Sequence, residues 1–83
     1  MLDYGVAIIK ICARLSKMAI GKHIGNQLLR SGTSVGANYE EARGAQSKAD
    51  FIHKLQIVLK ETRESFYWLK LIPAFSNFER SRD

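Results

Sequence analysis

The sequence predicts an all-α fold for this chain of 83 residues, and three observations favour it. Apolar residues recur at alternating intervals of three and four along three segments, about 2–20, 23–43 and 47–72; this is the spacing of a helix face. The single proline is residue 73, so the first 72 residues are free to be helical. The apolar content of 46% is typical of a folded chain. We expect one helical domain over residues 1–72 and an irregular tail over residues 73–83.

The first helix is expected over residues 2–20. Its apolar stripe begins with Leu2, Val6 and Ile9, and neighbouring apolar residues widen it. Gly21 is placed to end this helix, because glycine often follows a helix C-terminus.

The middle segment, 23–43, contains the stretch RSGTSVGANYEEA and supports two interpretations. A heptad pattern favours a helix; it runs without a break through Ile24, Leu28, Ser31, Val35, Asn38 and Ala42. The composition favours a loop, because each glycine inside a helix costs about 1 kcal/mol relative to alanine. A helix here needs packing to offset that cost, and small side chains permit close approach of a neighbour. The expected packing residues are Ser31, Gly32, Val35, Gly36 and Asn38. Gly44 is placed to end such a helix.

The third helix, 47–72, has the clearest pattern. Ser47 is a candidate N-cap with Asp50 three residues later, and Pro73 predicts the end of the helix. One apolar stripe consists of Ile52, Leu55, Leu59, Thr62, Phe66 and Leu69. A second seam on another side consists of Ile57, Glu61, Glu64, Trp68 and Leu71. Because a helix in a small monomer needs only one apolar stripe, the second seam predicts an oligomer contact at Ile57, Trp68 and Leu71.

Charge is distributed unevenly along a chain whose net charge is +5. Five of the thirteen basic residues fall in the first thirty positions, where Asp3 is the one acid; they are Lys10, Arg14, Lys17, Lys22 and Arg30. Lys10, Arg14 and Lys17 have the spacing of a single helix face. This pattern indicates a polyanionic partner such as RNA or DNA, although an ordinary solvated surface is the alternative. No aromatic residue lies within this stripe, so base stacking is not expected from it.

Three catalytic or ligand-binding chemistries fit the sequence poorly. The run GTSVGAN lacks the lysine of a phosphate-binding loop and follows no strand-like segment. Acidic residues and His53 supply metal-ligand types, but no Glu has a His three residues later. Cys12 has no recognisable catalytic signature around it and is interpreted as a small core residue. We therefore expect no enzyme, no cofactor and no metal site.

The expected compartment is the cytoplasm. A lone cysteine cannot form an internal disulfide, which favours a reducing compartment. The N-terminal run MLDYGVAIIKICARL does not resemble a signal peptide, and no stretch is as long as a membrane span.

Two longer stretches, QLLRSGTSVGANYEEARGAQSKADFIHKL and LKETRESFYWLKLI, resemble a known family. It comprises bacterial four-helix bundle proteins found in intervening sequences of 23S ribosomal RNA genes. The similarity runs from about residue 4 to residue 72 and includes the motifs RSGTS, AN, EA, SK, DF, KE and YWL in the family's order and spacing.

The resemblance implies an up-down antiparallel bundle in which the RSGTSVGANYEEA stretch lies inside the second helix. It also implies a ring, typically a pentamer. A related protein, the accessory variability determinant of diversity-generating retroelements, binds nucleic acid and a reverse transcriptase through a similar basic ring. The resemblance provides no catalytic residues.

The sequence departs from the family pattern near its end, where ten residues follow Pro73. Three helices are therefore expected, with the family's fourth helix missing or truncated. Two functions from different classes remain: an oligomeric module that binds RNA or DNA through its basic surface, and a purely structural or protein-binding module.

Overall fold

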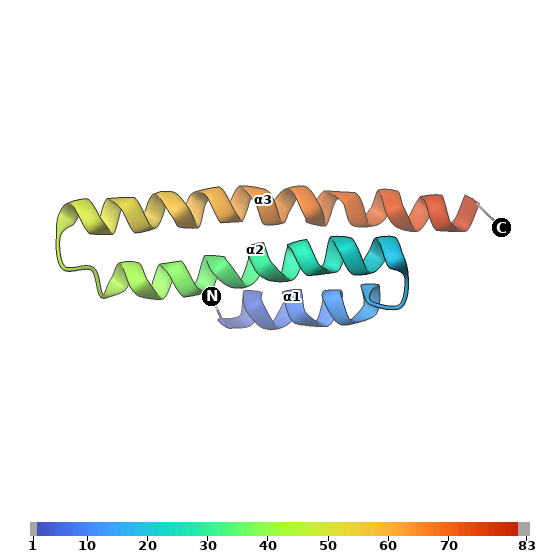
Figure 1. Cartoon of the computed structure of the whole chain (residues 1–83), viewed down its shortest axis with the longest axis horizontal. Coiled ribbons are helices and arrows are strands. Elements are labelled where there is room, and N and C mark those ends of the chain that lie inside the picture. Colours follow the sequence, from blue (N-terminus) through green and yellow to red (C-terminus); the bar gives the residue numbers. More distant parts are fainter. Residues whose placement is uncertain (1, 82–83) are drawn as a thin grey trace.

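The chain folds into three antiparallel helices, which confirms the all-α prediction. The computed structural model describes residues 2–81, without the side chains of residues 75 and 77–81. Its helices are α1 (Leu2–Leu15), α2 (Ala19–Arg43) and α3 (Lys48–Ser81). Figure 1 shows α2 running between α1 and α3, in the opposite direction to both. The principal extents of 55 × 18 × 17 Å describe a rod whose length is set by α3.

The core lies along α2. The middle segment is helical throughout, so the helix interpretation is correct and the loop interpretation is wrong. Of the six heptad residues, all but the half-buried Asn38 are buried, and Leu28 is fully inaccessible. Because α2 packs against both α1 and α3, its small residues lie at two helix interfaces. Tertiary packing therefore offsets the poor helix propensity of this stretch.

Polar side chains within α2 bond to carbonyls of their own helix. Ser31 Oγ donates to the Gln27 carbonyl at 2.9 Å, and Asn38 Nδ2 donates to the Ser34 carbonyl at 2.9 Å. Thr33 Oγ1 likewise donates to the carbonyl of Leu29, one helical turn earlier. The buried hydroxyl of Ser31 thus has a partner and does not carry the cost of an unsatisfied polar group.

Glycine permits close helix approach at one of the two predicted positions. A Cβ at Gly32 would lie 3.0 Å from both γ carbons of Ile8 on α1, so Gly32 is a tight packing position as expected. A Cβ at Gly36 would meet nothing within 4 Å. The distance at Gly32 supports the close-packing prediction there, which stays a prediction, whereas Gly36 lines an open groove and the prediction is wrong for it.

The connection between α1 and α2 differs from the prediction. α1 ends at Leu15 rather than near residue 20, and α2 begins at Ala19 rather than at 23. Ser16 Oγ donates to the Ala13 carbonyl at 2.8 Å, a local bond that competes with continuation of the helix. Gly21, predicted to end the first helix, is buried within α2.

α3 continues past Pro73 to Ser81, so the prediction of an irregular tail is wrong for residues 73–81. Residues 82 and 83 lie outside the described part of the chain. Proline lacks an N–H and deprives the carbonyl four residues earlier of its partner. Pro73 itself is exposed to solvent.

The ends of α2 and α3 nearest the connecting loop are placed as predicted. α2 ends at Arg43 with Gly44 as its C-cap, although Gly44 does not adopt a positive φ. Ser47 Oγ accepts a hydrogen bond of 3.0 Å from the Asp50 backbone N–H, which confirms Ser47 as the N-cap of α3.

We expect Ser47→Ala to lower the free energy of unfolding by about 1 kcal/mol, because the Asp50 N–H loses its acceptor. Chemical denaturation followed by circular dichroism measures this difference. Ser47→Asp should retain most of the stability because its carboxylate also accepts the bond. A Ser47→Ala protein as stable as the original would show that the cap contributes nothing.

Candidate nucleic-acid interface

Four of the five predicted basic residues lie exposed around the α1–α2 connection. Lys10 and Arg14 lie on α1, Lys17 in the turn, and Lys22 in the first turn of α2. None of the four forms an ion pair with the described residues. Because α1 ends at Leu15, Lys17 does not continue the helical stripe of Lys10 and Arg14 as the sequence suggested. These four residues form a basic end around the turn.

The fifth basic residue, Arg30, has a different environment from the basic end. Its guanidinium bonds to Glu61 at 3.3 Å and also to Glu64, so it joins α2 to α3. The Glu61 side chain is only 13% exposed. Arg30 therefore neutralises two carboxylates and is not available to phosphates as predicted.

The Glu64 carboxylate also holds Trp68. Trp68 Nε1 donates to Glu64 Oε2 at 3.1 Å, and the indole meets the rings of His23 and Tyr67 edge-on at centroid distances of 6.0 and 5.0 Å. Trp68 thus has partners on α2 and α3 within this chain. Trp68 was assigned to an oligomer contact because it was expected to be an apolar group without a partner. That reason no longer applies. Ile57 and Leu71 are half-buried, and their part in such a contact stays a prediction.

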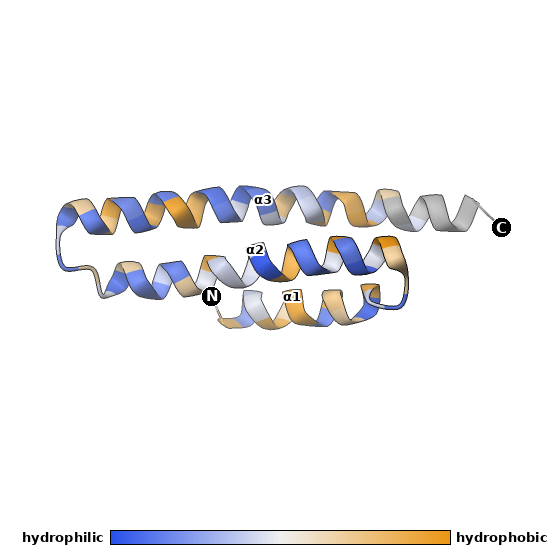
Figure 2. Ribbon diagram, in the orientation of Figure 1, coloured by the Kyte–Doolittle hydropathy of each residue, from blue (hydrophilic) through white to orange (hydrophobic). Residues whose placement is uncertain are grey.

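The apolar stripe predicted to be the buried one is partly exposed. Ile52, Leu59 and Phe66 each expose about half of their surface, at 46%, 51% and 51%. They are seven residues apart, which places them on one side of α3. Figure 2 shows hydrophobic segments at intervals along this helix. The exposed apolar surface of α3 therefore lies on the stripe that the sequence assigned to the core.

A groove lies between α1 and α3. These two helices meet only through their side chains, because α2 lies between their backbones. It measures about 650 Å³ and is lined by Ile11, Arg14, Leu15 and Met18 on one side and Leu69, Ile72, Pro73 and Ser76 on the other. Further along the same helices, Tyr4 Oη and Ser65 Oγ are 2.6 Å apart. Because Ser65 donates its proton to the Thr62 carbonyl, Tyr4 is the donor in this pair.

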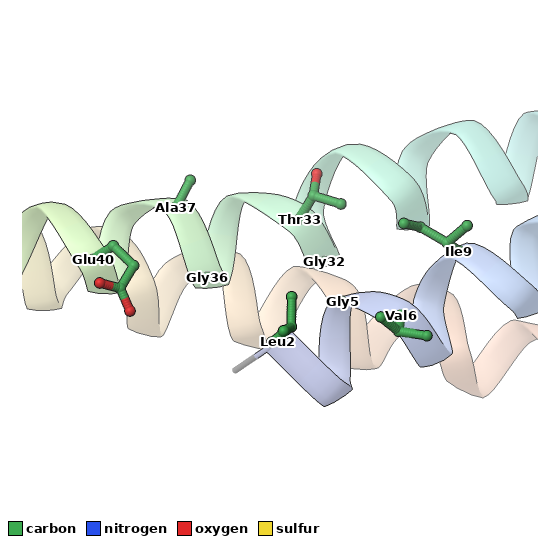
Figure 3. A pocket seen from close by; sticks show the side chains of 9 residues that line it. All are labelled: Leu2, Gly5, Val6, Ile9, Gly32, Thr33, Gly36, Ala37 and Glu40. Atoms are coloured by element: carbon green, nitrogen blue, oxygen red, sulfur yellow. The ribbon is translucent and has the colours of Figure 1, made fainter.

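A second groove, of about 390 Å³, separates the start of α1 from α2. Figure 3 shows Leu2, Val6 and Ile9 on α1 beside the ribbon of α2 at Gly32 and Gly36. Glu40 and Thr33 are its polar side chains, and the Thr33 hydroxyl is already bonded to the Leu29 carbonyl at 2.6 Å. An open apolar groove with so few polar groups does not have the features of a catalytic site.

The chemical alternatives weighed from the sequence find little support in this geometry. The GTSVGAN run is helical, so its backbone N–H groups are used within α2 and do not form a phosphate cradle. Among the side chains that the structure describes, no three His, Cys, Asp or Glu gather where they could share a metal ion. Burial raises the pKa of the Cys12 thiol, which donates to the Gly25 carbonyl at 3.1 Å. A protonated, hydrogen-bonded thiol is a poor nucleophile.

No helix within residues 2–81 combines the length and hydrophobicity needed to cross a membrane.

Comparison with known proteins agrees with the fold. A crystal structure at 1.70 Å of a protein with unknown function, from the S23 ribosomal protein family of Bacteroides thetaiotaomicron VPI-5482, superposes with a TM-score of 0.80 at 48% sequence identity. The match covers 86% of this chain and 66% of that chain, just under two thirds of its length. No curated protein matches the chain.

The family model described as 23S rRNA-intervening sequence protein matches residues 2–81. This range includes all three helices and both interhelical connections. The chain therefore belongs to the 23S rRNA-intervening sequence protein family.

Proposed function

We propose that this protein is a non-catalytic helical module that associates with copies of itself and binds RNA or DNA electrostatically through the basic end. The observation that carries the proposal is four exposed cations around the α1–α2 connection, without ion-pair partners among the described residues. No Asp or Glu occurs between residues 4 and 39, so the sequence around these cations supplies no competing negative charge. Such a surface attracts phosphates by releasing their condensed counterions.

Self-association would strengthen this binding. A single basic end contacts only a few phosphates, whereas several copies in one assembly form an extended positive surface and gain by multivalency. The exposed residues Ile52, Leu59 and Phe66 support association through α3, because apolar patches of this kind usually mark an interface. The pentamer implied by the family resemblance is the arrangement that we propose.

A structural or protein-binding module without a nucleic-acid role is the second candidate. The same apolar stripe of α3 and the groove between α1 and α3 favour it, because both offer hydrophobic surface to another helix. Under this alternative the basic end only keeps the protein in solution.

Charge reversal of the basic end tests the proposal. We expect Lys10→Glu, Arg14→Glu, Lys17→Glu and Lys22→Glu together to weaken binding to a labelled 20-nucleotide RNA at least tenfold at low salt. The slope of log affinity against log salt should fall by about 3, since each lost phosphate contact on a single strand contributes roughly 0.7. Fluorescence anisotropy at several salt concentrations measures both quantities.

A matched control reverses charge at the opposite end of the rod, where α2 meets α3 (Figure 1). Arg43→Glu, Lys48→Glu and Lys54→Glu should affect RNA binding much less. Circular dichroism and light scattering establish that both variants keep their fold and oligomeric state. A folded basic-end variant that binds RNA as tightly as the original would refute the proposal and favour the protein-binding module.

A further inference from the structure

A second basic surface, which was not predicted from the sequence, lies on the solvent-exposed side of α3. Lys60, Arg63, Tyr67 and Lys70 follow one another at intervals of three, four and three residues, and all four are exposed. Such intervals place them on one side of a helix. At a rise of 1.5 Å per residue, the stretch from Lys60 to Lys70 is about 15 Å long.

Negative charge is directed away from this face. The acids of α3 in this region, Glu61 and Glu64, point toward α2 and bond to Arg30. Lys60, Arg63 and Lys70 form no ion pair with the described residues. An ordinary solvated helix face mixes charges of both signs. On this one, three cations share one side of the helix with the exposed ring of Tyr67.

The ring of Tyr67 is held in place from within the structure. Arg30 fixes Glu64, Glu64 accepts the hydrogen bond of the Trp68 indole, and that indole contacts Tyr67 edge-on at 5.0 Å with an interplanar angle of 74°. Tyr67 nevertheless remains 55% exposed. An oriented ring with a free surface loses little conformational entropy when a planar ligand stacks on it.

We propose that this face binds single-stranded nucleic acid, with an unpaired base stacked on Tyr67 and phosphates held by Lys60, Arg63 and Lys70. An aromatic platform flanked by cations is the combination that recognises single strands, because a duplex keeps its bases within the helical stack. The inference builds on the proposed function, since it concerns the same class of ligand, but it assigns a different surface and a preference for unpaired strands.

The test compares three fluorescein-labelled 12-mers at low salt: oligo(dT), a duplex of the same length, and a strand of abasic sugar-phosphate units. We expect the unaltered protein to bind oligo(dT) more tightly than the abasic strand. Tyr67→Ala should weaken oligo(dT) binding by roughly 5- to 100-fold and leave binding of the abasic strand unchanged. Tyr67→Trp should restore the preference for bases.

Tyr39→Ala is the matched control, because it makes the same substitution at another exposed tyrosine, which is 38% exposed and lies on α2. It should leave oligo(dT) binding unaltered. Trp68 is the sole tryptophan and contacts Tyr67, so its fluorescence should change when oligo(dT) binds and not when the abasic strand binds.

The outcomes separate the two proposals. Equal binding of oligo(dT) and the abasic strand, or no effect of Tyr67→Ala, overturns the stacking site while leaving the electrostatic function of the basic end in place. Failure of all three 12-mers to bind overturns both.

Discussion

Gly32→Leu should lower the free energy of unfolding by about 1–3 kcal/mol through overpacking. The first carbon of any side chain at this position would lie 3.0 Å from both γ carbons of Ile8, closer than carbon atoms normally approach. Ile8 is only 2% exposed and has little room to move. The remaining carbons of leucine would push α1 away from α2. Denaturant unfolding at a fixed protein concentration measures the loss.

Gly36→Leu is the matched control, because it makes the same chemical change one helical turn away, where a Cβ meets nothing within 4 Å. Gly36→Leu should be neutral or stabilising by up to about 1 kcal/mol, since leucine favours the helix over glycine. Combining Gly32→Leu with Ile8→Ala should cost less than the sum of the two single substitutions, because the smaller side chain makes room for the leucine. Equal effects of the two glycine substitutions would show that α1 does not pack against Gly32.

Arg30→Met should destabilise the fold by about 1–2 kcal/mol, less than a fully buried ion pair because the Arg30 side chain is 49% exposed. The change leaves Glu61 and Glu64 near each other without their cation, and the Glu61 side chain is only 13% exposed. The Glu64 carboxylate that holds the Trp68 indole also loses its anchor. Thermal unfolding measures the stability, and a shift of Trp68 fluorescence reports the local change.

Arg43→Met serves as the comparison, because Arg43 pairs with Glu40 on the surface of α2, where both side chains are more than 60% exposed. Such a pair contributes about 0–1 kcal/mol. Adding Glu61→Gln and Glu64→Gln to Arg30→Met should recover stability by removing the uncompensated charges. If Arg30→Met and Arg43→Met have the same small effect, the Arg30 cluster is an ordinary surface pair.

Local features of the chain were predictable from the sequence. The heptad from Ile24 to Ala42 favoured a helix against a composition that resembles a loop, and the structure has a helix there with most heptad residues buried. The Ser47 cap and the end of α2 at Gly44 were also predicted. Each of these features depends on residues within a few positions of one another, where helix periodicity and capping act.

The helix ends that were wrong show where local rules weaken. Gly21 and Pro73 both predicted an end, and both lie inside helices. In α2 a buried environment accommodates the glycine. In α3 an exposed position tolerates the proline. Neither environment is visible in the neighbouring residues, because burial depends on which other helices lie alongside.

The amino-acid sequence by itself determined the helices, their main heptad faces and the concentration of cations near the N-terminus. Only the tertiary structure decided which cations remain available, because Arg30 is matched to acids more than thirty residues away on α3. It also decided which seam of α3 lies toward α2, leaving Ile52, Leu59 and Phe66 half exposed. When a helix carries two apolar stripes, the sequence pattern does not say which one is buried. The positions of the neighbouring helices determine which stripe is covered.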